Sequence, residues 1–294
     1  VIELAKKNGA DIVKFAPASR FDKESQIFKI MPETKTVVEQ CPGINPMGYI
    51  EDLERITEEE LYSHYRKILS ESRIDIIFSG NFDEDEAVKT AYKFAENLPE
   101  REGINITETY RSAPDKVKTV TDKMDVTQGK LCMGFRTKEG AGREDYPIYT
   151  VYNCIFGGSA VSKLFNNVRE KLSLCYYVGS SIDRLKEIMV VRSGVEFDKF
   201  KTAEDEILHQ QSLMEKGEFT DEEIDFAKKY LITAYESNLD SISAMAEYYT
   251  MQIILGTNIS IEEMTKRIED VKREEIIEAA KSMKLDTIYY MEAE

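Results

Sequence analysis

The sequence predicts an α+β protein of two related domains, the first of which is incomplete. Three observations lead to this fold class. A length of 294 residues suits two domains better than one or three. A segment that contains Pro and Gly separates two parts of the chain that have regular apolar patterns. A helix and strand near the start of the chain are matched by the same pair near its end, as expected for two copies of one fold.

The boundary between the domains is predicted at residues 99–121. This segment includes Pro99 and Pro114 and shows no sustained apolar period, which is typical of a linker. We therefore assign residues 1–98 to the C-terminal part of the first domain and residues 122–294 to the second domain.

The two domains share a short pattern. In the first, "ITEEELYSHYRKI" predicts a helix and "RIDIIFSG" the strand that follows it. In the second, "VKREEIIEAAKSM" and "KLDTIYYMEA" predict the same order, with Ile56 aligned to Val271 and Leu61 to Ile276. At this spacing, the earlier part of the first copy falls before Val1. We therefore expect this sequence to be the later part of a longer protein.

The second domain is predicted to mix strands and helices. A strand over 129–137 precedes a helix over 146–158, and two strands with a charged turn at 184–187 predict a hairpin. Thr220 and Glu223 form the spacing of a capping box at the start of a helix. The later elements are predicted as helices over 201–217, 220–239, 243–255, 261–268 and 273–283 and a strand over 285–293.

One helix of this domain leads directly to a strand. The stretch "SAVSKLFNNVREKL" predicts an α-helix, with one apolar face formed by Val161, Leu164, Phe165, Val168 and Leu172. Arg169 lies at the edge of this face, near the end of the helix. Tyr176 follows where the pattern changes to that of a strand, and Gly157 and Gly158 precede the helix.

Composition excludes several classes of partner. The net charge of −16 argues against nucleic acid, whose binding depends on Lys and Arg clusters. No apolar run approaches the roughly 18 to 20 residues of a membrane span, so we expect no membrane partner. The four cysteines have no CxxC spacing and are predicted to be free thiols in a reducing, cytoplasmic compartment: Cys41, Cys132, Cys154 and Cys175.

Histidine content bears on metal binding. The chain has two histidines, His64 and His209, which lie far apart in predicted helices. Neither has a second histidine at ligand spacing. We therefore predict no metal site, no catalytic residue and no cofactor within this chain.

The region that contains Arg169 resembles a known family. The stretch "FGGSAVSKLFNNVREKLSLCYYVGSSID" is similar to the second-domain signature of the pitrilysin-type zinc peptidases, which include insulin-degrading enzyme and the mitochondrial processing peptidase. The stretch "GYIEDLERITEEELYSHYRKILSESRIDIIFSGNF" resembles the end of the family's first domain. The resemblance begins at about Gly48 and is greatest to bacterial members without the zinc motif. Its signature residues are Gly157, Gly158, Ser162, Leu164, Phe165, Arg169, Glu170, Lys171 and Tyr176.

The resemblance implies a fold and a site. Each domain would be an antiparallel-rich sheet with helices packed on one face, and two halves of two domains would enclose a peptide chamber. It implies that Arg169 and Tyr176 bind the substrate, because a guanidinium and a phenol can donate hydrogen bonds to a carbonyl oxygen or an oxyanion. Zinc would be bound by an inverted His-x-x-Glu-His motif on an earlier domain or on another subunit.

That motif occurs nowhere in the 294 residues. The intact protein either carries it upstream and forms a homodimer, or lacks it and forms a heterodimer with a zinc-bearing peptidase half. We favour the second arrangement. In both, the chain is predicted to be the substrate-binding portion of a zinc metallopeptidase and inactive by itself. A non-catalytic scaffold and a small acidic interaction module are the alternative functions.

Structural roles are the alternative for the individual residues. Arg169 would then complement a helix dipole, and Tyr176 would belong to the core. Tyr177 competes with Tyr176 for the substrate-binding role, because the register of the strand is open. Close backbone packing at the end of a helix is enough to explain Gly157 and Gly158.

Overall fold

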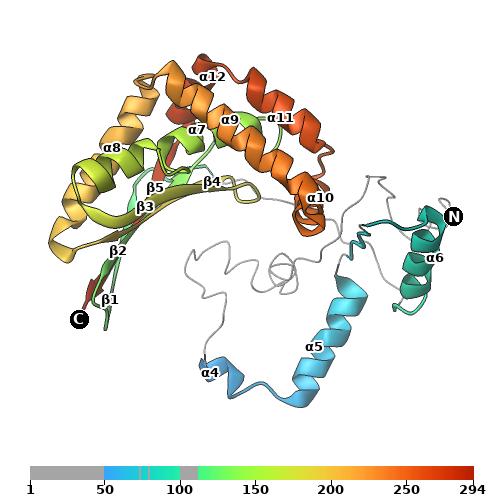
Figure 1. The fold of residues 1–294 in the computed structure, drawn as a ribbon. Helices are drawn as coiled ribbons and strands as arrows, with labels where there is room; N and C mark the ends of the chain where they lie inside the picture. Colours follow the sequence, from blue (N-terminus) through green and yellow to red (C-terminus); the bar gives the residue numbers. More distant parts are fainter. Residues whose placement is uncertain (1–49, 73, 79, 100–111) are drawn as a thin grey trace. The chain divides into compact units, whose positions relative to one another are not determined.

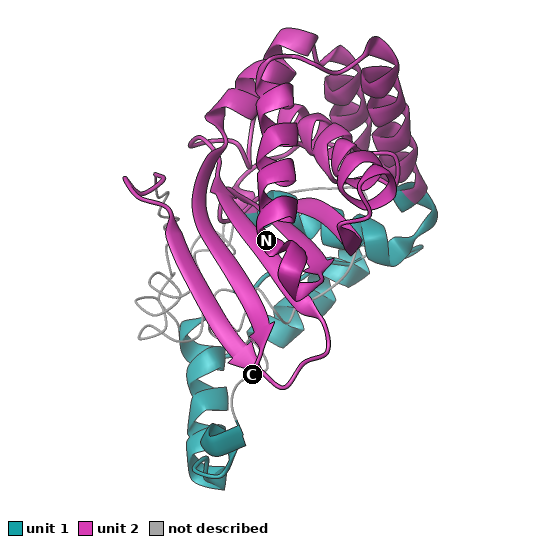
Figure 2. Ribbon diagram, turned by 90° about the vertical axis from the view of Figure 1, so that its left-hand side faces the viewer, with its two compact units in different colours: residues 1–107, 238–254 teal, residues 108–237, 255–294 magenta. Residues whose placement is uncertain are grey.

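The computed structural model describes residues 50–72, 74–78, 80–99 and 112–294 (Figure 1). The chain divides into two compact units, which are coloured separately in Figure 2. Unit 1 comprises residues 1–107 and 238–254, and unit 2 comprises residues 108–237 and 255–294. Among the described residues, no helix combines the length and apolar character needed to cross a membrane.

Unit 2 is built on a five-stranded sheet with the order β1-β5-β2-β4-β3. β1 pairs with β5 in parallel, and the other three pairs are antiparallel. The sheet is therefore antiparallel-rich, and the predicted α+β class is confirmed. The strands are β1 (Lys118–Met124), β2 (Gly129–Arg136), β3 (Cys175–Asp183), β4 (Ile188–Val195) and β5 (Lys284–Ala293).

Helices cover one face of this sheet (Figure 1). Alternate residues of β2 point into the core, where Leu131, Met133 and Phe135 are almost fully buried. The intervening residues Lys130 and Cys132 lie on the opposite face, which we call the open face because no described helix of unit 2 covers it. The covering helices are α7 (Tyr146–Phe156), α8 (Phe200–Glu215), α9 (Asp221–Ser237), α11 (Ile261–Asp270) and α12 (Arg273–Ser282).

Local signals in the sequence set several of these elements. The predicted hairpin forms between β3 and β4. At the start of α9, Glu223 accepts a hydrogen bond from the Thr220 backbone N–H (2.7 Å), and the Thr220 hydroxyl accepts one from the Glu223 N–H (3.2 Å). The predicted capping box is thus confirmed. Gly217 follows α8 with a φ of +74°, a left-handed conformation that glycine adopts without strain.

Unit 1 contains α4 (Ile50–Leu53), α5 (Glu58–Glu71), α6 (Glu84–Ala95) and all but the last residue of α10 (Ile242–Leu255). α5 confirms the predicted helix and begins with a capping box between Thr57 and Glu60. The strand predicted after it is wrong for the described residues 74–78, which form none. A strand exists only where a neighbour supplies backbone hydrogen bonds, and no described residue pairs with this segment.

β1 begins inside the segment predicted as the linker. Residues 118–121 of the range 99–121 form its first four positions. Most side chains of β1, an edge strand, are exposed, so its sequence lacks the alternation of apolar and polar residues by which strands are recognised. For this reason the sequence predicted a linker at residues 118–121, where the structure has a strand.

The helix predicted before β3 also differs. Residues Phe165–Lys171 form a π-helix, η1, in place of the expected α-helix. The Leu172 N–H donates to the Asn167 carbonyl, five residues back, at 3.1 Å. Leu164 and Val168, four residues apart, are both fully buried. Val161, in the turn before the helix, and Leu172, at its C-cap, lie outside the π-helix and are exposed.

Candidate functional site

Arg169 is presented by the π-helix η1. Its guanidinium carbon lies 4.7 Å from the centre of the Phe165 ring, which is a cation–π contact. Its Nε lies 3.7 Å from the Glu170 carboxylate, and its side chain is 41% exposed. The ring therefore supports an arginine whose guanidinium remains accessible to a ligand.

A tight reversal follows Arg169. Ser173 has a φ of 50°, in the left-handed region that residues other than glycine seldom adopt. The Ser173 N–H donates to the Arg169 carbonyl at 3.1 Å, and the Leu174 N–H donates to the Val168 carbonyl at 3.0 Å. These bonds close the π-helix and turn the chain directly into β3.

Tyr176 is an extra residue at the start of β3. Cys175 pairs with Val195 and Tyr177 with Gly194, so Tyr176 has no partner on β4. This register shift is a β-bulge, a feature that redirects a side chain. Tyr176 is 61% exposed. Because of the bulge, the Tyr176 side chain does not follow the regular alternation of side chains between the two faces of the sheet.

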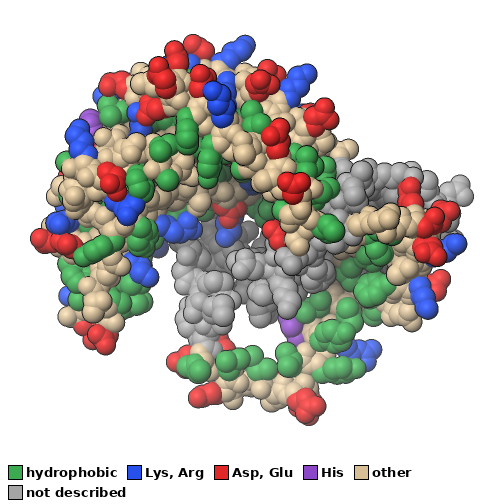
Figure 3. All heavy atoms as spheres, viewed as in Figure 1, with side chains coloured by type: hydrophobic (Ala, Val, Ile, Leu, Met, Phe, Trp, Pro, Cys, Tyr) green, Lys and Arg blue, Asp and Glu red, His purple; other side chains and the backbone are tan. Residues whose placement is uncertain are grey.

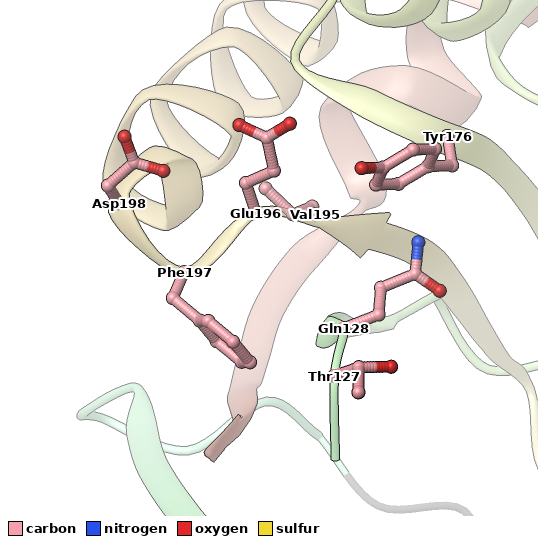
Figure 4. Close-up of a pocket in the computed structure, with 7 residues that line it drawn as sticks. All are labelled: Thr127, Gln128, Tyr176, Val195, Glu196, Phe197 and Asp198. Atoms are coloured by element: carbon pink, nitrogen blue, oxygen red, sulfur yellow. The ribbon is translucent and has the colours of Figure 1, made fainter.

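The structure brings Arg169 and Tyr176 into the lining of one pocket. This pocket has a volume of about 370 Å³ and is also lined by Glu170, Ser173, Leu174, Cys175 and Glu196. A second pocket of about 380 Å³ adjoins it, because Tyr176 and Glu196 line both (Figure 4). The remaining residues of the second pocket are Thr127, Gln128, Val195, Phe197 and Asp198.

Glu196 places a negative charge beside Tyr176. Its carboxylate lies 2.7 Å from the Lys199 ammonium, and that ion pair lowers the pKa of Glu196. The Tyr176 hydroxyl, which faces Glu196 in Figure 4, contributes in the same direction to the pKa of Glu196. Glu196 therefore stays ionised and can accept a hydrogen bond from the phenol.

Tyr177 occupies a different position from Tyr176. A Cβ added to Gly194 would lie 2.5 Å from Cε1 of Tyr177, so the Tyr177 ring lies over Gly194 on the open face. Of the two neighbouring tyrosines, Tyr176 is the one that lines the pocket with Arg169. Tyr176 therefore remains the candidate for the predicted role.

Gly157 and Gly158 allow the end of α7 to pack closely against its neighbours, which for Gly157 include β3. A Cβ on Gly157 would lie 2.5 Å from the Ser180 hydroxyl and 2.8 Å from Leu164. The Ser180 N–H donates to the Gly157 carbonyl at 2.9 Å. A Cβ on Gly158 would lie 2.5 Å from the Asn153 amide. The predicted close packing at the end of a helix is confirmed.

The described residues do not fit a zinc ion. His64 lies on α5 and His209 on α8, in different units. Within the described ranges, no three His, Cys, Asp or Glu side chains are grouped so as to hold a metal. Cys154 is buried, which raises the pKa of its thiol to about 11. Cys41 lies outside the described residues.

A family model described as the peptidase M16 inactive domain matches residues 55–231. The chain belongs to the peptidase M16 family. The match spans more than half of the sequence, and it confirms the resemblance to the pitrilysin-type zinc peptidases. The matched range ends within α9 and includes both Arg169 and Tyr176.

Two curated relatives place this M16 chain among peptidase-like proteins. "Probable inactive metalloprotease YmfF" of Bacillus subtilis (strain 168) is 34% identical over 244 residues, which cover 83% of this chain and 57% of the relative. An "Uncharacterized zinc protease" of Rickettsia bellii (strain RML369-C) is 25% identical over 266 residues, which cover 87% of this chain and 60% of the relative. The chain therefore spans less than two thirds of either relative.

Solved structures share the fold. A conserved protein from Enterococcus faecalis V583 has a TM-score of 0.79 and 29% identity, covering 93% of this chain and 64% of its own. A chain of complex III2 from Candida albicans has a TM-score of 0.66 and 16% identity, covering 92% of this chain and 69% of its own. At 16% identity, the second likeness shows the M16 fold alone.

Sequence reasoning missed the residues that surround Tyr176. Glu196 follows β4 directly and lies at the same end of the hairpin as Tyr176. Regular pairing outward from the predicted turn at 184–187 places Val195 opposite Tyr176 and Glu196 opposite Cys175. The bulge at Tyr176 shifts this register, so the predicted turn alone did not place Glu196 beside Tyr176.

Proposed function

We propose that this chain is the substrate-binding portion of an M16 peptidase, in which Arg169 and Tyr176 bind a carbonyl oxygen of the peptide. The observation that carries the proposal is the shared pocket of Arg169 and Tyr176 on either side of one chain reversal. Both side chains can donate hydrogen bonds. Neither is a carboxylate, so neither would bind the metal ion in place of the substrate. Such donors suit an oxygen on which negative charge develops.

Zinc belongs, in this proposal, to another domain or to a partner subunit. The 294 residues contain no His-x-x-Glu-His, and the described part offers no ligand set in its place. The partner is a zinc-bearing peptidase half, in a homodimer or a heterodimer. The name of the Bacillus subtilis relative, an inactive metalloprotease, supports the arrangement without the motif. The chain alone is then inactive, and its own residues bind and orient the peptide.

Glu196 and Lys199 have a supporting role. The Lys199 ion pair fixes the Glu196 carboxylate beside the Tyr176 hydroxyl. In the free protein, this carboxylate can accept the phenolic hydrogen and so hold the ring at the pocket. A peptide carbonyl then replaces Glu196 as the acceptor when substrate binds.

The experiment compares two double variants in the complex with the zinc-bearing half. One is Arg169→Ala with Tyr176→Ala, and the control is Lys229→Ala with Tyr230→Ala, which removes an exposed cation and phenol on α9, outside the pocket. Hydrolysis of an internally quenched peptide is measured together with the affinity of the two halves. We expect the first variant to lose on the order of 10² to 10³ in rate with assembly unchanged.

The scaffold alternative predicts the opposite pattern. The likeness in fold to a chain of complex III2 from Candida albicans is the observation that favours this alternative. If the rate survives replacement of Arg169 and Tyr176, the two residues do not hold substrate and the scaffold is favoured. An equal loss of rate in the control variant also contradicts the proposal.

A further inference from the structure

The open face of the sheet carries cations that have no ion-pair partner among the described residues. The chain has 55 acidic and 39 basic side chains, so most cations have carboxylates available. On the helical side, ion pairs are frequent, as in Lys163–Glu223 and Arg273–Asp221, and Figure 3 shows acidic and basic side chains interspersed over the helices of unit 2. Lys130 and Arg192, in contrast, form no ion pair with any described residue.

Lys130 and Arg192 lie close together on that face. Cys132 pairs with Arg192 across β2 and β4, and Lys130 pairs with Gly194 in the next row. Side chains on such a diagonal are about 7 to 8 Å apart. The positive charges of Arg192 and Lys130 both act to lower the pKa of Cys132 against the effect of burial, as expected for two cations beside one thiol. The two cations therefore form one basic site.

Aromatic rings border this basic site. Tyr177 lies over Gly194 on β4, and Tyr289 pairs with Cys132 from β5. Between the two rings, the surface of the sheet is formed by Gly194 and Cys132. Because these residues are small, Lys130 and Arg192 remain accessible on the open face. We call Lys130, Cys132, Tyr177, Arg192, Gly194 and Tyr289 the basic strip.

The carboxylates on the same face are already engaged. Asp122 accepts a hydrogen bond from the Tyr289 hydroxyl at 3.1 Å, and Asp286 accepts one from Arg136 at 2.8 Å. Asp183 accepts the backbone N–H groups of the hairpin turn, each at 3.0 Å. Arg192 itself donates to the Ser181 hydroxyl at 2.8 Å. Asp286 is thus paired with Arg136, and neither Asp122 nor Asp183 forms an ion pair with Lys130 or Arg192 in the part of the chain that the structure describes.

We infer that the basic strip is a docking surface for an acidic segment of polypeptide, with Arg192 and Lys130 binding its Asp or Glu carboxylates. Charge complementarity selects this occupant over a neutral or basic peptide. The inference rests on the proposed function and deepens it by naming the substrate class. Tyr177 of the strip directly follows Tyr176 of the pocket, so one extended peptide can contact both.

The test uses two fluorescent peptides of about twelve residues that differ only in Glu or Gln at alternate positions. Affinity for the full chain is measured by fluorescence anisotropy at about 50 mM and about 300 mM NaCl. We expect the Glu peptide to bind about five- to tenfold more tightly at low salt, with the difference reduced at high salt. Lys130→Gln with Arg192→Gln should abolish this difference. The control Lys229→Gln with Lys281→Gln removes the same charge from the helical surface and should preserve it.

The outcomes separate the inference from the proposed function. Equal affinity for both peptides in the unaltered chain overturns the inference alone. Replacing Arg169 and Tyr176 by Ala should weaken both peptides by the same factor. Binding of neither peptide contradicts the proposed function and the inference with it. Displacement of the Glu peptide by inorganic phosphate, but not by NaCl of equal ionic strength, would show a general anion site and overturn the inference. Thermal melting verifies that each variant is folded.

Discussion

The backbone N–H of Ser180 donates a 2.9 Å hydrogen bond to the carbonyl oxygen of Gly157. This bond joins the end of α7 to β3, which is one of the two edge strands of the sheet and carries Tyr176. It also gives one exposed N–H of that edge a partner. A Cβ at position 157 would lie 2.9 Å from the Ser180 nitrogen, so the junction depends on glycine.

Gly157→Ala should therefore destabilise the protein by about 1 to 3 kcal/mol, because backbone must move to relieve the overlap. Urea denaturation measures this free energy of unfolding. Gly134→Ala is the matched control, since a Cβ on Gly134 would meet its nearest atom at 3.9 Å. If both variants have the same stability, the close approach at Gly157 has no energetic consequence and this reading is wrong.

The ionisation of Asp286 should make the free energy of unfolding depend on pH. Burial acts to raise the pKa of Asp286, but hydrogen bonds from Thr287 and from Arg136, at 2.8 Å, hold it below its usual value. The carboxylate therefore contributes stability in full above its unfolded pKa of about 3.9, and this contribution is lost as the pH falls through the lower folded pKa.

Asp286→Asn should accordingly cost about 1 kcal/mol at neutral pH, and the difference from the unaltered protein should shrink below about pH 4. Thermal melting between about pH 2.5 and 7 measures both curves. A difference that stays constant across this range would show that the Asp286 charge does not contribute.

The Phe165 ring supports the Arg169 guanidinium at 4.7 Å. Phe165→Leu keeps an apolar side chain but removes the cation–π contact, which is worth about 0.5 to 1 kcal/mol at an exposed site. We expect peptide affinity to fall about two- to fivefold, as measured by fluorescence anisotropy. Phe226→Leu, on α9 and stacked on Tyr230, removes a comparable ring outside the pocket and should not alter affinity. Equal affinities in the two variants would contradict the role of the ring.

Cys154 should be the slowest of the three described thiols to react. It is 3% exposed, and burial raises its pKa to about 11. At pH 8, on the order of 10⁻³ of this thiol is ionised, and the thiolate is the reactive form. Mass spectrometry after brief iodoacetamide treatment should find adducts on Cys132 and Cys175 before Cys154. Early labelling of Cys154 in the folded protein would show that it is not buried as described.

Elements with local signals were predictable from the sequence. The capping box at Thr220 and Glu223 and the apolar alternation of β2 depend on residues that are near one another in the chain. Arg169 and Tyr176 line one pocket, and the substrate-binding role that the resemblance implies for them stays a prediction.

Elements that depend on distant partners were not predictable in the same way. η1 is a π-helix where the apolar spacing predicted an α-helix, and that spacing does not distinguish hydrogen bonds to the fourth residue back from bonds to the fifth. β1 is stabilised by backbone pairing with β5, a strand that follows more than 150 residues later in the chain. Glu196 and the bulge at Tyr176 depend on the register between β3 and β4, which periodicity alone does not give.

The most direct test of the central claim is a double-mutant cycle on peptide affinity with Arg169→Ala, Tyr176→Phe and their combination. If both side chains bind one carbonyl oxygen, each single change should weaken binding, and the two effects should be non-additive by about 0.5 kcal/mol or more. Isothermal titration of the chain with an extended peptide measures each corner of the cycle. Unchanged affinity in both single variants, or two losses that simply add, would contradict a shared contact.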